Sequence, residues 1–177
     1  MPIDTDAEER EVVLLDTSTA IALIVEDHEA HAATLEAVRG RRLGLAGHAW
    51  FETYSVLTRL PAGLRRSPTD VVRLLAHNFA ASKFLAEAES AEFGAELARL
   101  NVSGGAVYDA LVGAAARQHR LPLVSGDARA RPVYEALGVE IELMLVTLGP
   151  VDIGTSVDRG GVGVYSPPVL RPEDSAS

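Results

Sequence analysis

Short apolar runs alternate along the chain with longer segments whose apolar residues recur at helical spacing. Several segments carry explicit boundary signals, such as Ser67 followed by Pro68 at a helix start, Pro61 at a helix end, and glycines after two others. The pattern predicts strands at residues 12–16, 43–46, 83–86, 121–125 and 139–143. It predicts helices at 17–24, 28–38, 48–60, 68–79, 90–100, from just after Gly105 to about 119, and 133–137.

This alternation is typical of the α/β class, in which a parallel sheet is covered by helices on both faces. Ligands of such sheets bind beyond the carboxyl ends of the strands. Asp16 and Asp127 each lie just past the end of a predicted strand, so we expect them at one edge of the sheet. Glu52 lies in a helix that follows a strand, and Asp109 near the start of a helix that follows two glycines. The sequence therefore predicts that four carboxylates converge there.

Composition indicates one globular domain with two flanking segments. The chain has 177 residues, 47% of them hydrophobic, which is enough for a sizeable core. We expect an acidic N-terminal extension at 1–11, the folded domain at 12–144, and an irregular, Gly- and Pro-punctuated tail at 145–177 that contributes no catalytic residue. The absence of cysteine excludes disulfides and thiolate metal sites, and no apolar stretch is long enough for a membrane span, so a cytoplasmic protein is expected.

A net charge of −9 at first argues against a nucleic-acid ligand, because phosphate contacts dominate affinity for such ligands. Much of the acidic excess, however, lies in residues 1–11 and 145–177. Arginines also cluster locally, although each cluster alone is more often a solvated surface. They are Arg39, Arg41 and Arg42; Arg59, Arg65 and Arg66; and Arg129 and Arg131. RNA binding is therefore permitted by the sequence but not established by it.

The four acids suggest a divalent-metal site. A carboxylate placed after a buried strand or among small apolar residues has a desolvation cost that a bound cation would offset. Hard oxygen ligands favour Mg²⁺, with Mn²⁺ as a substitute, and such ions support phosphodiester hydrolysis by activating water. Thr17 and Ser125 are candidate supporting residues, since either hydroxyl is placed to orient a carboxylate or a water.

Each acid also has an ordinary structural explanation. Asp16 and Asp109 could cap their helices, Glu52 could be a surface acid, and Asp127 a turn residue. Only their joint occurrence favours the metal site. Other enzyme classes fit less well: a haloacid-dehalogenase-like phosphatase needs an acid where Ser18 stands, and a receiver domain needs a lysine late in the fold, whereas Lys83 is the only lysine.

The chain resembles PIN-domain proteins, and most closely VapC-type toxin ribonucleases. The resemblance is carried by five sequence blocks across residues 12–144: LLDTS at 14–18, ETYSVLTRLP at 52–61, VYDALV at 107–112, LVSGD at 123–127 and YEALGV at 134–139. The family's first acid usually lies near the chain start, and residues after about 144 have no counterpart in it. Neither departure affects the four acids.

The resemblance implies a PIN-like three-layer sandwich and an Mg²⁺-dependent endoribonuclease that cleaves structured RNA such as tRNA or rRNA. It implies that Asp16, Glu52, Asp109 and Asp127 bind the metal. It further implies a homodimer, for which Trp50, Phe51, Tyr54, Leu57 and Leu60 supply apolar surface, and a VapB-like antitoxin whose C-terminal segment occupies the active-site groove. The alternative is a non-catalytic PIN-like module that binds RNA or protein without cleaving it.

Overall fold

A four-stranded parallel sheet forms the centre of the protein in the computed structural model, which describes residues 10–61 and 63–144. The sheet order is β2-β1-β3-β4, so β1 and β3 are the inner strands. Leu14 pairs with Gly44 on one side and with Leu123 on the other. The strands are β1 (Val12–Leu15), β2 (Arg42–Leu45), β3 (Leu123–Ser125) and β4 (Ile141–Leu143). The tail at 145–177 and most of the predicted N-terminal extension lie outside the described residues.

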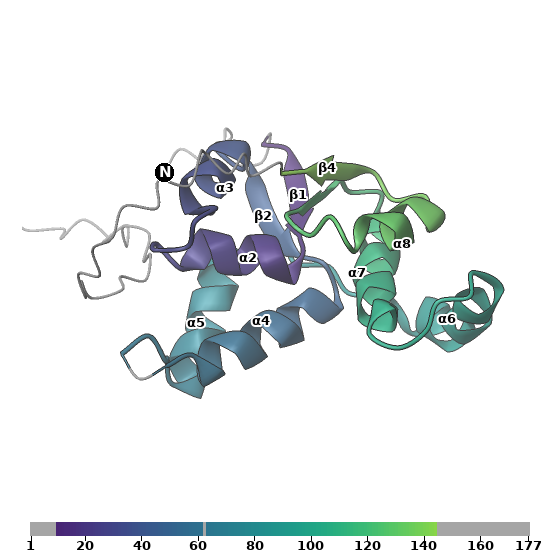
Figure 1. Cartoon of the computed structure of the whole chain (residues 1–177), viewed down its shortest axis with the longest axis horizontal. Coiled ribbons are helices and arrows are strands. Elements are labelled where there is room, and N and C mark those ends of the chain that lie inside the picture. The colour runs from purple at the N-terminus through teal and green to yellow at the C-terminus, as the bar shows by residue number, and fades with distance from the viewer. Residues whose placement is uncertain (1–9, 62, 145–177) are drawn as a thin grey trace, which may run out of the picture.

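Helices cover both faces of this sheet, which confirms the predicted three-layer α/β architecture (Figure 1). Val13 and Leu15 point into one core, built with helices α2 to α5, whereas Leu14 points into the other, built with α6 to α8. This alternation follows from the two-residue period of a strand. The helices are α2 (Thr17–Ile24), α3 (His31–Ala37), α4 (His48–Arg59), α5 (Pro68–Asn78), α6 (Glu87–Arg99), α7 (Ala106–His119) and α8 (Arg131–Ala136).

Helix α7 contains an unbroken buried stretch from Val112 to Ala116. Its small residues let neighbouring elements approach closely. A Cβ added at Gly113 would lie 3.0 Å from side-chain atoms of both Tyr134 and Leu137, in and just after α8. On the outer side, Arg117 makes two 2.7 Å hydrogen bonds to the Glu96 carboxylate of α6. These contacts hold α7, the helix that carries Asp109, against α8 and α6.

The prediction of a strand at residues 83–86 is wrong. This part of the chain forms only isolated bridges to β2, between Gly44 and Ala80 and between Ala46 and Lys83. The Ala81 and Lys83 amides donate to the carbonyls of Leu43 and Leu45, after which the chain turns away to begin α6 at Glu87. The apolar run that suggested a strand includes Phe84, whose side chain is largely exposed.

The other elements agree with the sequence prediction to within a few residues. The largest shifts are in α3, which begins three residues later than predicted, and α6, which begins three residues earlier. Across the described ranges 10–61 and 63–144, no helix has both the length and the apolar character needed to cross a bilayer.

Gly44 is the position on β2 where the passing chain comes closest. A Cβ there would lie 2.4 Å from the carbonyl carbon and oxygen of Ala81, both backbone atoms. We therefore predict that Gly44→Ala lowers the free energy of unfolding by about 1–3 kcal/mol, as overpacking in a core does. Gly94→Ala is the matched control: this site on α6 is open, so the helix should gain about 0.5–1 kcal/mol. Urea denaturation measures both, and equal effects would contradict the close approach.

Candidate active site

Asp16 stands at the carboxyl end of β1 and is almost completely buried, with 4% of its surface exposed. Three groups donate hydrogen bonds to its carboxylate. Ser125 Oγ donates to Oδ2 at 2.6 Å, while Ser18 Oγ and the Thr19 amide each donate to Oδ1 at 2.8 Å. The Thr19 bond makes Asp16 the N-cap of α2, so the capping explanation is correct for this acid. Burial nevertheless raises the pKa of Asp16, and the hydrogen bonds offset this only in part.

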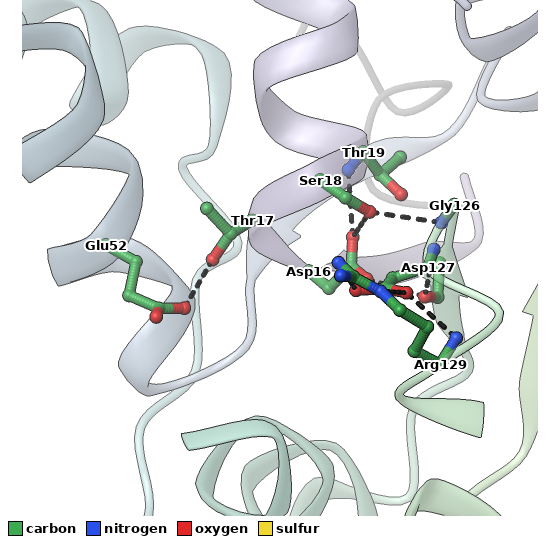
Figure 2. A network of polar contacts seen from close by, with 9 residues as sticks. Asp16, Thr17, Ser18, Thr19, Glu52, Gly126, Asp127 and Arg129 are labelled. Atoms are coloured by element: carbon green, nitrogen blue, oxygen red, sulfur yellow. Dashed lines mark hydrogen bonds and ion pairs between the residues drawn. The ribbon is translucent and has the colours of Figure 1, made fainter. Parts of the chain in front are cut away.

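The end of β3 is tied to the end of β1 by hydroxyl groups (Figure 2). Ser125 Oγ also accepts from the Asp127 amide at 3.1 Å, and Ser18 Oγ accepts from the Gly126 amide at 3.3 Å. The two predicted strand ends therefore share one edge of the sheet, as expected from parallel topology. Ser125 orients the Asp16 carboxylate directly.

Asp127 is half-buried and paired with Arg129. The guanidinium donates to both carboxylate oxygens, from Nε at 3.0 Å and from Nη2 at 2.9 Å, and the Arg129 amide donates at 2.8 Å. The hydrogen bonds from Arg129 hold the pKa of Asp127 below its ordinary value. The amide contact two residues along the chain is the turn geometry that explains Asp127 locally.

Glu52 reaches the same region from α4. Thr17 Oγ1 donates to Glu52 Oε2 at 2.7 Å, so the residue after Asp16 orients the acid of a different helix. Figure 2 shows the Thr17 side chain directed toward Glu52, away from the group formed by Asp16, Asp127 and Arg129.

Asp109 lies in the first turn of α7 and does not cap it, because the cap position is Gly105. Burial raises the pKa of Asp109 above its ordinary value of 3.8, and the negative charges of Asp127, Glu52 and Asp16 raise it further. Mutual repulsion of this kind requires proximity. The four acids, together with Thr17, Ser18, Val112 and Tyr134, line a single pocket of about 260 Å³.

The chemistry of this pocket fits a hard divalent cation, because its charged donors are carboxylate oxygens. Within the described residues, however, no three Asp, Glu or His side chains converge closely enough to hold an ion as they stand. Three of the carboxylates already accept hydrogen bonds from the protein. Asp127 accepts from Arg129, Glu52 from Thr17, and Asp16 from its three donors. The structure thus brings all four predicted acids to one pocket without arranging them as a finished coordination sphere.

Three residues of the site were not identified from the sequence. Ser18 follows Asp16 by two positions and Arg129 follows Asp127 by two, so local polar spacing was the available signal. Tyr134 has no such signal, because only the packing of α8 against α7 brings it to the pocket.

Comparison with known proteins identifies the family of the chain. The family model described as PIN domain matches residues 13–136, and the chain belongs to this family. Ribonuclease VapC27 of Mycobacterium tuberculosis is 49% identical over 127 residues, covering 72% of this chain and 93% of the relative. Ribonuclease VapC40 of the same species is 43% identical over 131 residues, covering 73% and 96%. The expected VapC-type PIN family is therefore confirmed.

A solved structure independently supports the fold. The crystal structure of FitAcB from Neisseria gonorrhoeae aligns with a TM-score of 0.51 over 73% of this chain and 95% of that chain. Its sequence identity is only 20%, so the likeness concerns the architecture alone.

We predict that Asp109→Asn stabilises the metal-free protein. The raised pKa means that ionised Asp109 destabilises the fold once the pH exceeds 3.8, so the gain should be present at pH 7 and shrink as the pH falls toward that value. We expect a rise in Tm of roughly 2–4 °C, the shift that about 1 kcal/mol produces in a chain of this size. Thermal unfolding in EDTA between pH 4 and 7 measures it. Asp16→Asn is the comparison, and its Tm should rise less, because the change disturbs three hydrogen bonds. An unchanged Tm for Asp109→Asn at pH 7 would argue against carboxylate repulsion.

Proposed function

We propose that the protein is a divalent-metal-dependent endoribonuclease, the toxin of a type II toxin–antitoxin pair, that hydrolyses structured RNA such as tRNA or rRNA. One observation carries the proposal: four carboxylates from four separate elements line one pocket at the carboxyl edge of the sheet. The curated relatives are named ribonucleases, which supports the same reaction class.

Asp16, Glu52, Asp109 and Asp127 would hold Mg²⁺, or Mn²⁺ in its place. When bound, such an ion polarises a phosphodiester and stabilises the charge that develops on its oxygens. The protein's own contribution is preorganisation. Ser18, Ser125 and the Thr19 amide keep the Asp16 carboxylate in one orientation, and Thr17 fixes Glu52.

The distribution of unpaired arginines supports an RNA substrate. Arg39, Arg41, Arg129 and Arg131 all form ion pairs with nearby acids. In contrast, Arg59 and Arg65, at and beyond the end of α4, donate only to backbone carbonyls in the described structure. Glu52 and Arg59 belong to the same helix, about 10 Å apart along its axis. We infer that the RNA backbone follows α4 from the acid pocket to these arginines.

Antitoxin control forms part of this proposal. A VapB-like partner whose C-terminal segment lies in the active-site groove would block the same four acids, and the similarity to VapC ribonucleases supports such a partner. A non-catalytic PIN-like module that only binds RNA or protein is the second candidate. Four converging carboxylates disfavour it, since they would repel RNA phosphate without a cation.

We predict that Asp16→Asn and Asp109→Asn each reduce RNA cleavage at least 100-fold in Mg²⁺, because each removes one charge from the cation site at nearly constant shape. EDTA should abolish wild-type cleavage. Glu89→Gln, an exposed acid on α6 far along the chain from the site, is the control and should retain wild-type activity. The substrate for this assay is a structured RNA with circular dichroism as a check on folding. If a pure wild-type protein binds RNA without cutting it, the non-catalytic alternative is correct.

Self-association is the remaining part of the proposal. Aromatic rings form a connected surface cluster. The ring centroids of Trp50 and Phe51 lie 5.4 Å apart, and those of Phe51 and Phe84 lie 6.0 Å apart. Phe51 is the most accessible of the residues expected at the dimer surface, at 55% exposed, and Leu57 is buried in the core. Three others are half-buried: Trp50, Tyr54 and Leu60. An exposed aromatic cluster of this kind is typical of protein interfaces.

We predict a homodimer formed across this cluster, with two active sites along one groove. Phe51→Glu should shift the protein to a monomer, because it places a charge in the centre of the apolar surface. Val72→Glu on α5, which is 46% exposed, is the control and should leave the dimer intact. Sedimentation equilibrium measures both variants; a wild-type monomer at high micromolar concentration would contradict the dimer.

A further inference from the structure

Tyr134 is a large buried residue of the pocket that the proposed chemistry does not yet use. Its side chain is 1% exposed and lies against Gly113 of α7, where small size permits the contact. The ring lines the pocket beside Asp16, Glu52, Asp109 and Asp127. Tyr134 is therefore held in place by core packing while its polar end belongs to the site.

No hydrogen bond of the Tyr134 hydroxyl is present among the described residues, yet its oxygen is not one of the fully buried atoms that lack a partner. The hydroxyl therefore stays accessible from the pocket, while the rest of the side chain is buried. Tyrosine suits such a place because its body is apolar and its tip is polar. The other hydroxyls of the pocket are engaged: Thr17 donates to Glu52, and Ser18 donates to Asp16. Tyr134 thus supplies the one uncommitted hydroxyl donor within the described lining of the pocket.

This hydroxyl is protonated at physiological pH. The ordinary pKa of a tyrosine, about 10, already lies well above that range, and burial raises the pKa of Tyr134 further. The group is therefore a neutral O–H donor. A neutral donor can contact an anion in this pocket without competing with a cation for the carboxylates, which a lysine or arginine would do.

We propose that the Tyr134 hydroxyl binds the substrate by donating a hydrogen bond to a phosphate oxygen of the scissile phosphodiester. This inference rests on the proposed nuclease function. The Tyr134 hydroxyl would attract phosphate in a pocket whose charged lining residues are four acids, which repel it. Arg129, paired with Asp127, is the positive charge beside them. Because the ring is fixed by α7 and α8, the donor is in position before the substrate arrives.

The test is Tyr134→Phe, which removes one oxygen and retains the ring. We expect kcat/KM for RNA to fall about 10- to 100-fold, the loss of one hydrogen bond to a charged group. The Mg²⁺ concentration at half-maximal rate should stay within two-fold, and the Tm of the metal-free protein should stay the same or rise. Inorganic phosphate with Mg²⁺ should raise the Tm of the wild type more than that of the variant. Ser90→Ala, which removes an exposed hydroxyl from α6, should leave kcat/KM, the Mg²⁺ requirement and the stabilisation by phosphate unchanged.

Three results would overturn the inference. A kcat/KM within two-fold of wild type would mean that the hydroxyl does not contact substrate. A Tm lowered by several degrees would assign it a structural role, and a raised Mg²⁺ requirement would assign it to the cation site. If the wild type cuts no RNA, the nuclease proposal fails, and the difference in phosphate stabilisation alone then decides whether Tyr134 binds phosphate.

Discussion

The buried carboxylate of Asp16 is the constraint around which the rest of the molecule is arranged. A charged group at 4% exposure is tolerable only when it is hydrogen-bonded on all sides. Its donors come from α2 and from β3, which lies 109 residues further along the chain at Ser125. The same contacts that satisfy the charge therefore cap α2 and hold the two inner strands together. Folding and site assembly depend on one set of hydrogen bonds.

The other acids add a second constraint, which is repulsion. The negative charges of Asp127, Glu52 and Asp16 disfavour the ionised form of Asp109. Arg129 reduces this repulsion only in part, since its side chain lies in solvent. A core designed for stability alone would not contain this arrangement. Functional sites commonly depart from the rules of stability in this way, and the well-packed remainder of the domain compensates. Here the compensation comes from the two apolar cores on either side of the sheet.

The sequence was sufficient to predict four of the strands, the seven helices and the approach of the four acids, because strand ends and helix signals are local features. The meeting of Asp16 with Asp127 followed from parallel topology alone. The segment at 83–86 could not be assigned correctly, since its hydrogen bonds depend on how it passes Gly44 rather than on its own residues. Tyr134 was also beyond local inference, because its place in the pocket depends on the fit between α7 and α8. Side-chain pairing, such as Asp127 with Arg129, likewise requires the folded backbone.

The wide separation of the inner strands along the chain has a consequence for biosynthesis. Ribosomes extend proteins from the N-terminus, so β1, β2 and the helix bearing Glu52 emerge long before β3. Ser125, which donates a hydrogen bond to Asp16, and Asp127 are synthesised only after most of the domain has been translated. Pairing of such distant segments is also slow relative to local helix formation. A nascent or prematurely terminated chain therefore lacks the pocket, and the cell that makes this protein meets a complete site only when synthesis of the domain is nearly finished.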